Sequence, residues 1–257
     1  MAVPEPSSEL VTTDVVGRVL VIAMQRPHKR NALDRALADA LSGALDRLDD
    51  DPDLWAGVLT GTPDVFSAGS DLTSGGDYVT ERGGAYGIIR RSRRRPLIAA
   101  VEGMALGGGM EIVLACDLVV AATTASFGFP EVARGLVPTS GGLFRTLMAM
   151  PRNLAHELVL TGQPIDASRA HAAGLVNRLS EPGRSVAVAV ELAGQIASNG
   201  PTAVSLALQA MREVDDATEA VGWPATDRAT AGLATSEDVR EGVAAFLEKR
   251  PPVWTGR

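Results

Sequence analysis

Two glutamates and three consecutive glycines fall within one short apolar stretch of this sequence. Residues 105–131 read ALGGGMEIVLACDLVVAATTASFGFPE, with Glu111 four residues after Gly107 and Glu131 directly after Pro130. Carboxylates are suited to general acid and base catalysis when a fold places two of them around one reacting group. The simpler interpretations are a salt-bridged helix residue for Glu111 and a capping or loop carboxylate for Glu131.

The glycines are placed to expose the start of a helix. The apolar pattern predicts a helix over 107–116, and glycine at its first residues leaves backbone N–H groups open to a ligand. Together with the helix dipole, such a terminus favours a phosphate or the developing negative oxygen of an activated carbonyl. Close packing of the helix against a strand is the alternative explanation of the triplet.

A second loop has the composition to add another donor. The stretch FSAGSDL (66–72) follows a buried strand and a turn, and its small residues allow a backbone N–H to point into a cleft. Two converging N–H donors make an oxyanion hole, which stabilises negative charge on a carbonyl oxygen.

Other familiar chemistries lack their residues. The glycine triplet does not have the G-x-G-x-x-G spacing, and no Gly-Lys-Ser/Thr occurs, which argues against nucleotide-phosphate transfer. No G-x-S-x-G elbow is present for a Ser-His-Asp hydrolase, and no histidine is placed by sequence to activate Ser70. Because His28, His156 and His171 are scattered and no cysteine accompanies them, we expect no metal site.

Composition limits the class of protein. The 257 residues, 46% of them hydrophobic, suffice for one large α/β domain, and the net charge of -7 argues against general nucleic-acid binding. The single cysteine, Cys116, cannot form an internal disulfide and lies in an apolar helix, which fits packing in a reducing compartment. No apolar run reaches the roughly 18 residues of a membrane span, and MAVPEPSSEL does not resemble a signal peptide. We expect a cytoplasmic protein that binds neither membrane nor nucleic acid.

Hydrophobic periodicity predicts strands and helices that alternate first, followed by helices alone. The expected strands cover a hairpin over 9–24 that turns at Gly17, then 55–60, 97–101, 118–122 and 174–178. The expected helices cover 34–50, 107–116, 140–149, 153–160, 184–198, 201–213, 216–232 and 236–248. This order predicts an α/β core over 1–195 and a C-terminal helical region over 196–257.

Five arginines form a basic cluster just before the strand expected at Leu97. They are Arg90, Arg91, Arg93, Arg94 and Arg95. The pattern is typical of a solvated helix end, and an anion or subunit contact is the alternative.

Six stretches carry a resemblance to a known family. They are RPHKRNALD (26–34), FSAGSDL (66–72), PLIAAVEGMALGGGMEIVLACDLVVA (96–121), FGFPEVARGLVPTSGG (127–142), LTGQPIDASRAHAAGLVNRL (160–179) and SEDVREGVAAFLEKRPPVW (236–254). In this order, covering nearly the whole chain, they resemble the enoyl-CoA hydratase/isomerase, or crotonase, superfamily. The resemblance implies a crotonase-like α/β spiral of ββα units with a C-terminal helical region that packs against neighbouring subunits in a homotrimer or a dimer of trimers.

The resemblance assigns roles to the residues singled out above. It implies that the backbone N–H groups of Ser70 and Gly108 are the two oxyanion donors, and that Glu111 and Glu131 are the catalytic pair. We expect Glu111 to act as the base toward water and Glu131 as the acid. The position of Ser70 is often alanine in the family, which a main-chain donor tolerates.

Coenzyme A contacts follow from the same resemblance. A cation is expected near 28–30, where this chain has His28, Lys29 and Arg30, with histidine at the place of the expected lysine. An aromatic residue and a lysine are expected in the last helix, at Phe246 and Lys249, three residues apart on one helix face. A core anchor and a solvated cation are the alternatives for this pair. The remaining expected substrate contacts are Ala68, Asp71 and Leu72, and the segment 75–89 is expected to line the acyl pocket.

The implied activity is hydration of a trans-2-enoyl-CoA thioester. Coenzyme A is part of this substrate, and no separate cofactor is expected. A carnitinyl-CoA-type dehydratase, an enoyl-CoA isomerase and a catalytically idle acyl-CoA-binding protein remain as alternatives. Two carboxylates around one water favour the hydratase over the isomerase, which needs a proton shuttle and no bound water.

Overall fold

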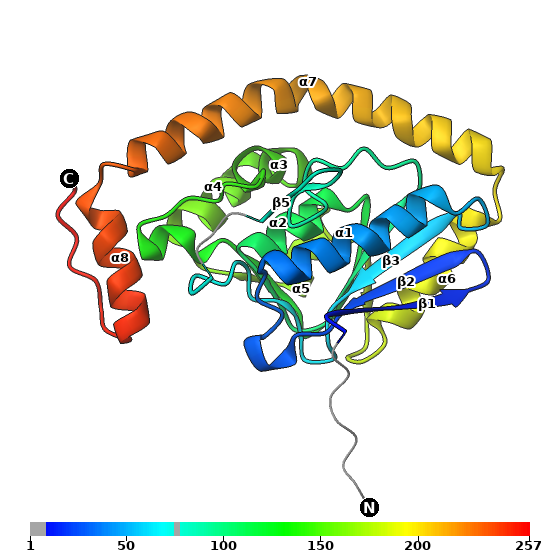
Figure 1. Ribbon diagram of the computed structural model, residues 1–257, viewed down its shortest axis with the longest axis horizontal. Coiled ribbons are helices and arrows are strands. Elements are labelled where there is room, and N and C mark those ends of the chain that lie inside the picture. The colour runs from blue at the N-terminus through cyan, green and yellow to red at the C-terminus, as the bar shows by residue number, and fades with distance from the viewer. Residues whose placement is uncertain (1–8, 75–77) are drawn as a thin grey trace, which may run out of the picture.

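The computed structural model describes residues 9–74 and 78–257, and two mainly parallel sheets form its centre (Figure 1). The larger sheet has the strand order β1-β2-β3-β7-β9-β12. Its strands are β1 (Val11–Val16), β2 (Val19–Met24), β3 (Ala56–Thr60), β7 (Leu97–Val101), β9 (Leu118–Ala122) and β12 (Arg178–Ser180). The β1–β2 hairpin is antiparallel, and the other pairs are parallel.

A second, four-stranded sheet has the order β11-β10-β8-β4. Its strands are β4 (Val65–Ser67), β8 (Met104–Leu106), β10 (Ser126–Gly128) and β11 (Ile165–Asp166). Along the chain, β3–β4, β7–β8 and β9–β10 each give one strand to each sheet, which is the repetition expected of a spiral of ββα units. The sequence predicted the strands of the larger sheet but not these short ones.

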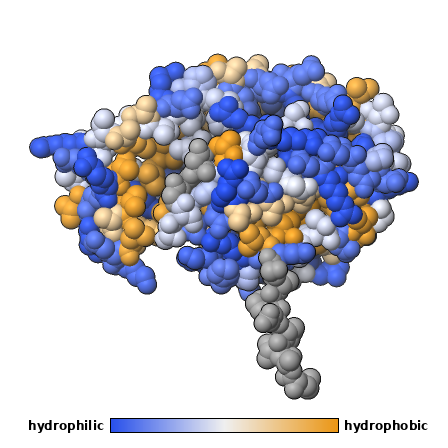
Figure 2. Space-filling model, viewed as in Figure 1, coloured by the Kyte–Doolittle hydropathy of each residue, from blue (hydrophilic) through white to orange (hydrophobic). Residues whose placement is uncertain are grey.

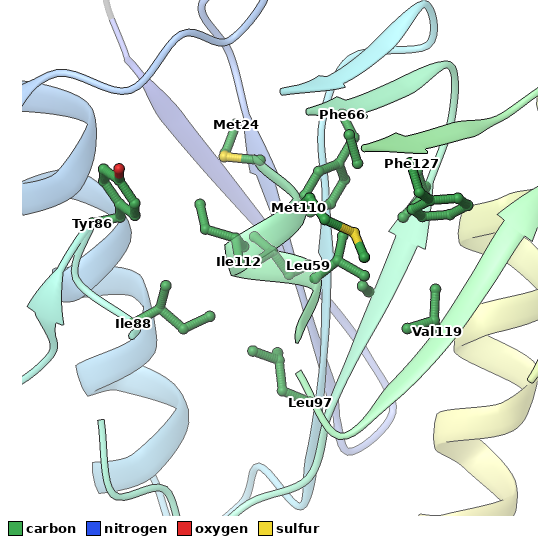
Figure 3. Close-up of a cluster of buried hydrophobic side chains, with 14 of the residues drawn as sticks. Met24, Leu59, Phe66, Tyr86, Ile88, Leu97, Met110, Ile112, Val119 and Phe127 are labelled. Carbon is green, nitrogen blue, oxygen red and sulfur yellow. The ribbon is translucent and has the colours of Figure 1, made fainter. Parts of the chain in front are cut away.

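The central strands of the larger sheet, β3, β7 and β9, are buried on both faces. Alternate residues therefore belong to two different hydrophobic clusters, as the period of two in a strand requires. Val58 and Ile98 face the smaller cluster under α6 (Ser185–Ala197), whereas Leu59 and Leu97 face the main core. Figure 3 shows the main core, where Met110 of α2 (Gly108–Ala115) points toward Phe66 and Phe127 of the second sheet, whereas Ile112 points the other way.

The predicted helices begin and end close to the observed ones, except that α5 (Ala167–Ala172) was not predicted and that two predicted helices are one in the structure. The remaining ones are α1 (Arg35–Asp50), α3 (Gly142–Ala149), α4 (Arg152–Thr161), α7 (Pro201–Leu233) and α8 (Glu237–Glu248). The prediction of two helices over 201–213 and 216–232 is wrong, because α7 runs unbroken through both. No glycine or proline lies at the expected break, and Pro224 is accommodated inside the helix.

The last predicted strand is displaced. Gly174 adopts a left-handed φ of 91°, and Leu175 and Val176 are buried without joining a ladder, so that β12 begins only at Arg178. Apolar residues in this stretch pack against the core, which gave the misleading strand signal.

Short elements complete the chain around the loops of interest. These are the 3-10 turns η1 (Pro27–Lys29) and η2 (Pro130–Arg134) and the small hairpin of β5 (Val79–Thr80) and β6 (Gly84–Ala85).

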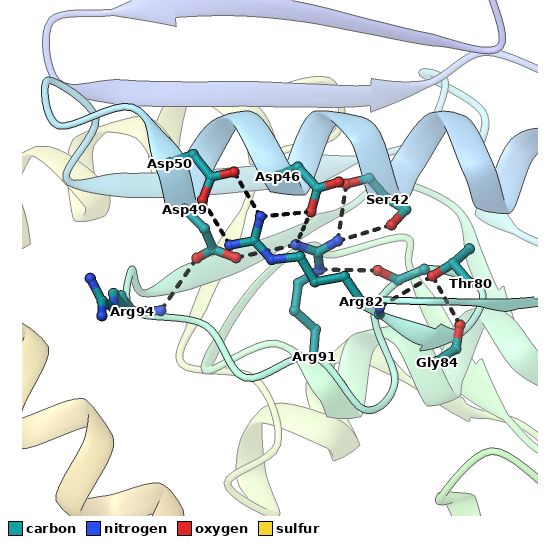
Figure 4. A network of polar contacts seen from close by, with 11 residues as sticks. Ser42, Asp46, Asp49, Asp50, Thr80, Arg82, Gly84, Arg91 and Arg94 are labelled. Carbon is teal, nitrogen blue, oxygen red and sulfur yellow. Dashed lines mark hydrogen bonds and ion pairs between the residues drawn. The ribbon is translucent and has the colours of Figure 1, made fainter.

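The arginine cluster is not a solvated helix end. Residues 90–95 form no helix, and Arg91 and Arg93 are buried. Arg91 donates to Asp46, Asp49 and Ser42 of α1, as Figure 4 shows. The carboxylates of α1 thus neutralise the buried guanidinium of Arg91. The sequence around Arg91 does not predict this pairing, because the carboxylates come from a distant element.

Candidate active site

The two predicted donor loops lie against each other. A Cβ built on Gly69 would lie 2.8 Å from the carbonyl oxygen of Leu106 and 3.1 Å from the nitrogen of Gly108. The loop after β4 therefore packs directly on the start of α2. Gly108 is the first residue of that helix, and Ser70 is half-buried beside it. The predicted donors Ser70 and Gly108 are thus brought together by packing.

Each glycine of the triplet has a different neighbour. A Cβ on Gly107 would lie 2.9 Å from Oε1 of Glu131, one on Gly108 would lie 2.9 Å from the Tyr86 hydroxyl, and one on Gly109 would lie 2.5 Å from the carbonyl oxygen of Ser67. Gly109 thus fits the alternative explanation of the triplet, which is close packing of the helix against a strand. Gly107 and Gly108 instead leave room for two polar side chains at the helix start.

Glu111 is buried within the first turn of α2. Its Oε1 accepts hydrogen bonds from the backbone N–H groups of Ser140 at 2.6 Å and Gly142 at 3.0 Å, where α3 begins. Burial raises the pKa of Glu111 to about 8, with the nearby Glu131 adding to the rise and the two N–H groups opposing it. Desolvation therefore outweighs the hydrogen bonds and favours the protonated acid.

Glu131 lies in the η2 turn, and its carboxylate reaches the start of α2 at Gly107. Within the described residues, its Oε2 is buried without a hydrogen-bond partner. Burial raises the pKa of Glu131 to about 7, against the lowering effect of Arg134. A buried carboxylate oxygen without a partner is a group ready to bind a water or a substrate proton.

The two glutamates act on each other. The charge of Glu131 raises the pKa of Glu111, so their titrations are coupled and the pair can hold one proton between them near neutral pH. The raised pKa values leave one carboxyl able to donate a proton while the other accepts one. Such a pair can serve as acid and base in the same reaction.

Sequence reasoning missed Tyr86 as a site residue. Its ring is 5% exposed, and its hydroxyl lies 2.7 Å from the Ser70 hydroxyl. The residue comes from the loop after β6, far along the chain from both Ser70 and Gly108. The glycine-rich segment contains two tyrosines, Tyr78 and Tyr86, and nothing in the sequence indicates that Tyr86 is the one at the site.

The predicted contacts around η1 divide into exposed and structural residues. His28, Lys29 and Arg30 are exposed. The carbonyl of Arg30 accepts a hydrogen bond from the N–H of Ala68, and the N–H of Leu33 donates to the carbonyl of Gly69. Asp71 is buried, and its carboxylate binds Arg26 at 2.9 Å and Lys29 at 3.9 Å. Hydrogen bonds from Thr73 and Arg26 hold its pKa far below the usual range. Asp71 thus fastens the two loops together, and half-buried Ala68 and Leu72 flank it.

The argument that placed Phe246 and Lys249 on one helix face is wrong. Helix α8 ends at Glu248, and Lys249 is its C-cap with a left-handed φ of 55°. Phe246 instead faces the η2 turn, where the Arg134 guanidinium carbon lies 4.3 Å from its ring centroid. Both Phe246 and Lys249 are exposed. Helix α8 therefore reaches the turn that carries Glu131 through Arg134, a contact that the sequence did not predict.

A cavity of about 470 Å³ lies between α7 and the body of the molecule. Its apolar lining includes Ile88, Ile89 and Trp223, and Arg145 belongs to its wall. The positive charge of Arg145 also lowers the pKa of Glu111, but neither Glu111 nor Glu131 lines the cavity. Of the segment 75–89, which was expected to line the acyl pocket, the last residues Ile88 and Ile89 line this cavity. Residues 75–77 of that segment lie outside the described ranges.

Residues 9–74 and 78–257 contain no group of three His, Cys, Asp or Glu side chains that could hold a metal ion. No helix in the same ranges is long and apolar enough to cross a membrane.

Comparison with known proteins identifies the family. Residues 15–257 match the model of the enoyl-CoA hydratase/isomerase family. The chain is 37% identical over 250 residues to the mevalonyl-coenzyme A hydratase of Aspergillus fumigatus, covering 92% of this chain and 91% of that protein. It is 36% identical over 255 residues to a probable enoyl-CoA hydratase of Mycobacterium leprae, covering 97% of this chain and 99% of that protein.

A solved structure agrees with this match. The crystal structure of a carnitinyl-CoA hydratase from Mycobacterium avium superposes with a TM-score of 0.92 at 40% identity, covering 98% of this chain and 100% of that one. This superposition confirms the predicted fold class, an α/β protein of the crotonase type. The chain belongs to the enoyl-CoA hydratase/isomerase family.

Proposed function

We propose that the protein is an enoyl-CoA hydratase, a hydro-lyase that adds water across the 2,3 double bond of a trans-2-enoyl-CoA thioester. The observation that carries the proposal is the meeting of Glu111, Glu131 and the start of α2 in one buried place. Gly107 brings Glu131 to the helix start, and Glu111 lies one turn further along the same helix.

The proposed mechanism begins at the thioester carbonyl. Its oxygen accepts hydrogen bonds from the backbone N–H groups of Ser70 and Gly108, so that negative charge moves onto the oxygen and C3 becomes electrophilic. Water adds to C3 as a carboxylate takes its proton, and a carboxylic acid supplies a proton to C2 of the enolate. The product is the 3-hydroxyacyl thioester.

The pKa values bear on which glutamate is the base. Burial raises the pKa of both glutamates, to about 8 for Glu111 and about 7 for Glu131, so either carboxyl can carry the shared proton. We therefore assign the acid and base roles to the coupled pair, which holds one proton in its active form.

A carnitinyl-CoA-type reaction is the second candidate. The solved structures that superpose well include a carnitinyl-CoA hydratase and a carnitinyl-CoA dehydratase from Mycobacterium avium, at 40% and 41% identity. Dehydration is the reverse of hydration at the same carbons, so the same glutamate pair serves both. The acyl substituent distinguishes the two candidates.

The proposed substrate binds through its coenzyme A half near η1 and α8. Lys29, Arg30 and Lys249 offer exposed cations for phosphate groups, and Phe246 offers a ring beside Arg134. We propose no cofactor beyond the coenzyme A of the substrate and a cytoplasmic location. The free Cys116, whose pKa burial raises to about 12, is consistent with a reducing compartment.

We further propose a homotrimer, alone or paired into a dimer of trimers. Helix α7 has 33 residues, of which Gly222 and Thr226 are the buried ones. Exposed apolar side chains on it that do not line the cavity include Leu206, Val214 and Val221. Apolar surface is also visible at the end of the molecule that carries α8 (Figure 2). Such a face is typical of a subunit contact.

The test of the activity is a product analysis with a panel of enoyl-CoA thioesters that differ in chain length and polar substituents. We expect the wild type to form 3-hydroxyacyl-CoA, with a mass 18 Da above the substrate as one added water requires. Glu111→Gln and Glu131→Gln should each lower kcat by about three orders of magnitude or more, and the double variant little further, because the pair acts as a unit.

Glu102→Gln is the matched control. Glu102 is also buried and also accepts two backbone N–H groups, those of Gly183 and Ser185, but it lies at the start of α6. Near-full turnover in either site variant would remove that glutamate from the mechanism. An equal loss of turnover in the Glu102 variant would show that the assay reports damage to the fold instead.

A further inference from the structure

Tyr86 is placed at the predicted oxyanion site by a strained turn. Its φ is 54°, in the left-handed region, between Gly84 at 66° and Gly87 at 78°. A bulky residue in this conformation costs free energy and is found where the surrounding structure needs it. The backbone N–H of Tyr86 donates to the carbonyl of Tyr78, which fixes the turn.

The turn aims the Tyr86 hydroxyl at both donor residues. It lies 2.7 Å from the Ser70 hydroxyl and 2.9 Å from the Cβ position of Gly108. In Figure 3 the Tyr86 ring lies at the edge of the core, with its hydroxyl on the side away from Ile88. The hydroxyl is thus beside the two residues whose backbone N–H groups are the proposed oxyanion donors.

Neighbouring hydrogen bonds determine where the proton of this hydroxyl points. Ser70 and Ser140 both interact with it, and the backbone N–H of Ser140 also holds Glu111. If the Ser70 hydroxyl donates to Tyr86, the Tyr86 proton is free to point at a substrate oxygen. Hydrogen bonds arranged in series in this way polarise one another.

We propose that Tyr86 is a further catalytic residue, whose hydroxyl donates a third hydrogen bond to the thioester oxygen of the substrate, with Ser70 as its positioning residue. The proposal rests on the hydratase function proposed above. No proton is transferred from Tyr86, which stays a neutral donor while negative charge grows on the substrate oxygen. Burial and the charge of Glu111 keep the pKa of Tyr86 well above its usual value, so the phenol remains protonated.

The experiment measures enolate stabilisation directly, apart from turnover. A 3-oxoacyl-CoA such as acetoacetyl-CoA loses a C2 proton to give an enolate that absorbs in the near ultraviolet, and its oxygen occupies the place of the reacting thioester oxygen. The wild type should raise the enolate fraction of the bound ligand. Tyr86→Phe should lower the enolate's affinity about tenfold to a hundredfold and lower kcat similarly, because two backbone donors remain. The affinity for saturated butyryl-CoA should change less than twofold.

Tyr78→Phe is the matched control. Its ring centroid lies 6.1 Å from that of Tyr86, and its hydroxyl donates to the carbonyl of Asp71. This variant should leave the enolate fraction unchanged, and Ser70→Ala should lower it less than Tyr86→Phe does. An enolate fraction in Tyr86→Phe equal to that of the wild type would overturn the role of Tyr86 while leaving the hydratase intact. A wild type that binds the ligand without enolate would overturn the oxyanion site itself and the Tyr86 proposal with it.

Discussion

At the residue scale, burial makes the two glutamates useful and also costly to the fold. Both pKa values are raised because the charged forms lose water, and Glu131 has a buried oxygen without a described partner. Ionisation of these buried carboxyls therefore lowers the stability of the folded protein. Active sites commonly combine such chemistry with lost stability.

This cost predicts the pH dependence of stability. The unfolded chain ionises Glu131 near 4.5 and the folded chain near 7, so its contribution to stability is fully present below pH 4.5 and is lost as pH rises through 7. Glu131→Gln cannot ionise, and it should stabilise the protein relative to wild type by about 2 kcal/mol at pH 8.5 and by much less at pH 5. Urea unfolding at the two pH values measures the difference. An equal difference at both would show that Glu131 does not titrate as described.

The residues of the site were only partly predictable. Glu111, Glu131 and the glycines stand out because a carboxylate or a glycine triplet is unusual in an apolar stretch. Tyr86 and Arg134 have no such contrast with their neighbours, and their roles come from contacts with Ser70 and Phe246 made only in the fold. Ser70 shows the same limit, because nothing in the sequence identified Tyr86 as the partner of its side chain.

At the element scale, a buried ion pair between Arg91 and Asp49 connects the loop before β7 to α1. The Arg91 side chain is fully buried, and Asp49 is 4% exposed. Arg91 also donates to the carbonyl of Gly87, next to Tyr86, so the tie holds the turn that positions the proposed third donor. Burying such a pair gives little net stability, but breaking it leaves a buried charge without its partner.

Arg91→Ala should therefore destabilise the protein by about 3 kcal/mol or more. Arg94→Ala is the matched control, because Arg94 is exposed and only its backbone N–H binds Asp49 (Figure 4). That control should change stability by about 0.5 kcal/mol or less. Thermal and urea unfolding of the two variants compare them. Equal, small effects would mean that the buried ion pair does not support the fold.

Elements were predicted well where one face or both faces are apolar over several turns or strand residues. The strands β4, β8 and β10 were missed because three residues carry too little periodicity to be distinguished from loops. They pair with one another, β4 with β8 and β8 with β10, across long separations in sequence. The site lies between these short strands and the start of α2, so its geometry was the least predictable part of the fold.

At the scale of the whole molecule, α7 and α8 form an arm that leaves the body and returns to it. Figure 1 shows α7 arching over the core and α8 following at its end. Gly222 packs against the ring of Phe144, and α8 packs on η2, where Gly242 meets the carbonyl of Arg134. The arm thus touches its own chain at a few points and leaves much of its apolar surface open to a second copy.

The outward face of α7 is the place to test the proposed assembly. Val214 and Val221 are 73% and 71% exposed, and they lie two turns apart on one side of the helix. If this face is a subunit contact, Val214→Asp with Val221→Asp places charges in an apolar interface and should convert a trimer, with a mass near three times 26.7 kDa, into monomers. Sedimentation velocity measures the mass. Asp227→Lys, six residues beyond Val221 and so on another face of the helix, is the control and should stay assembled. A double variant that keeps the mass of the trimer would show that α7 does not form the contact.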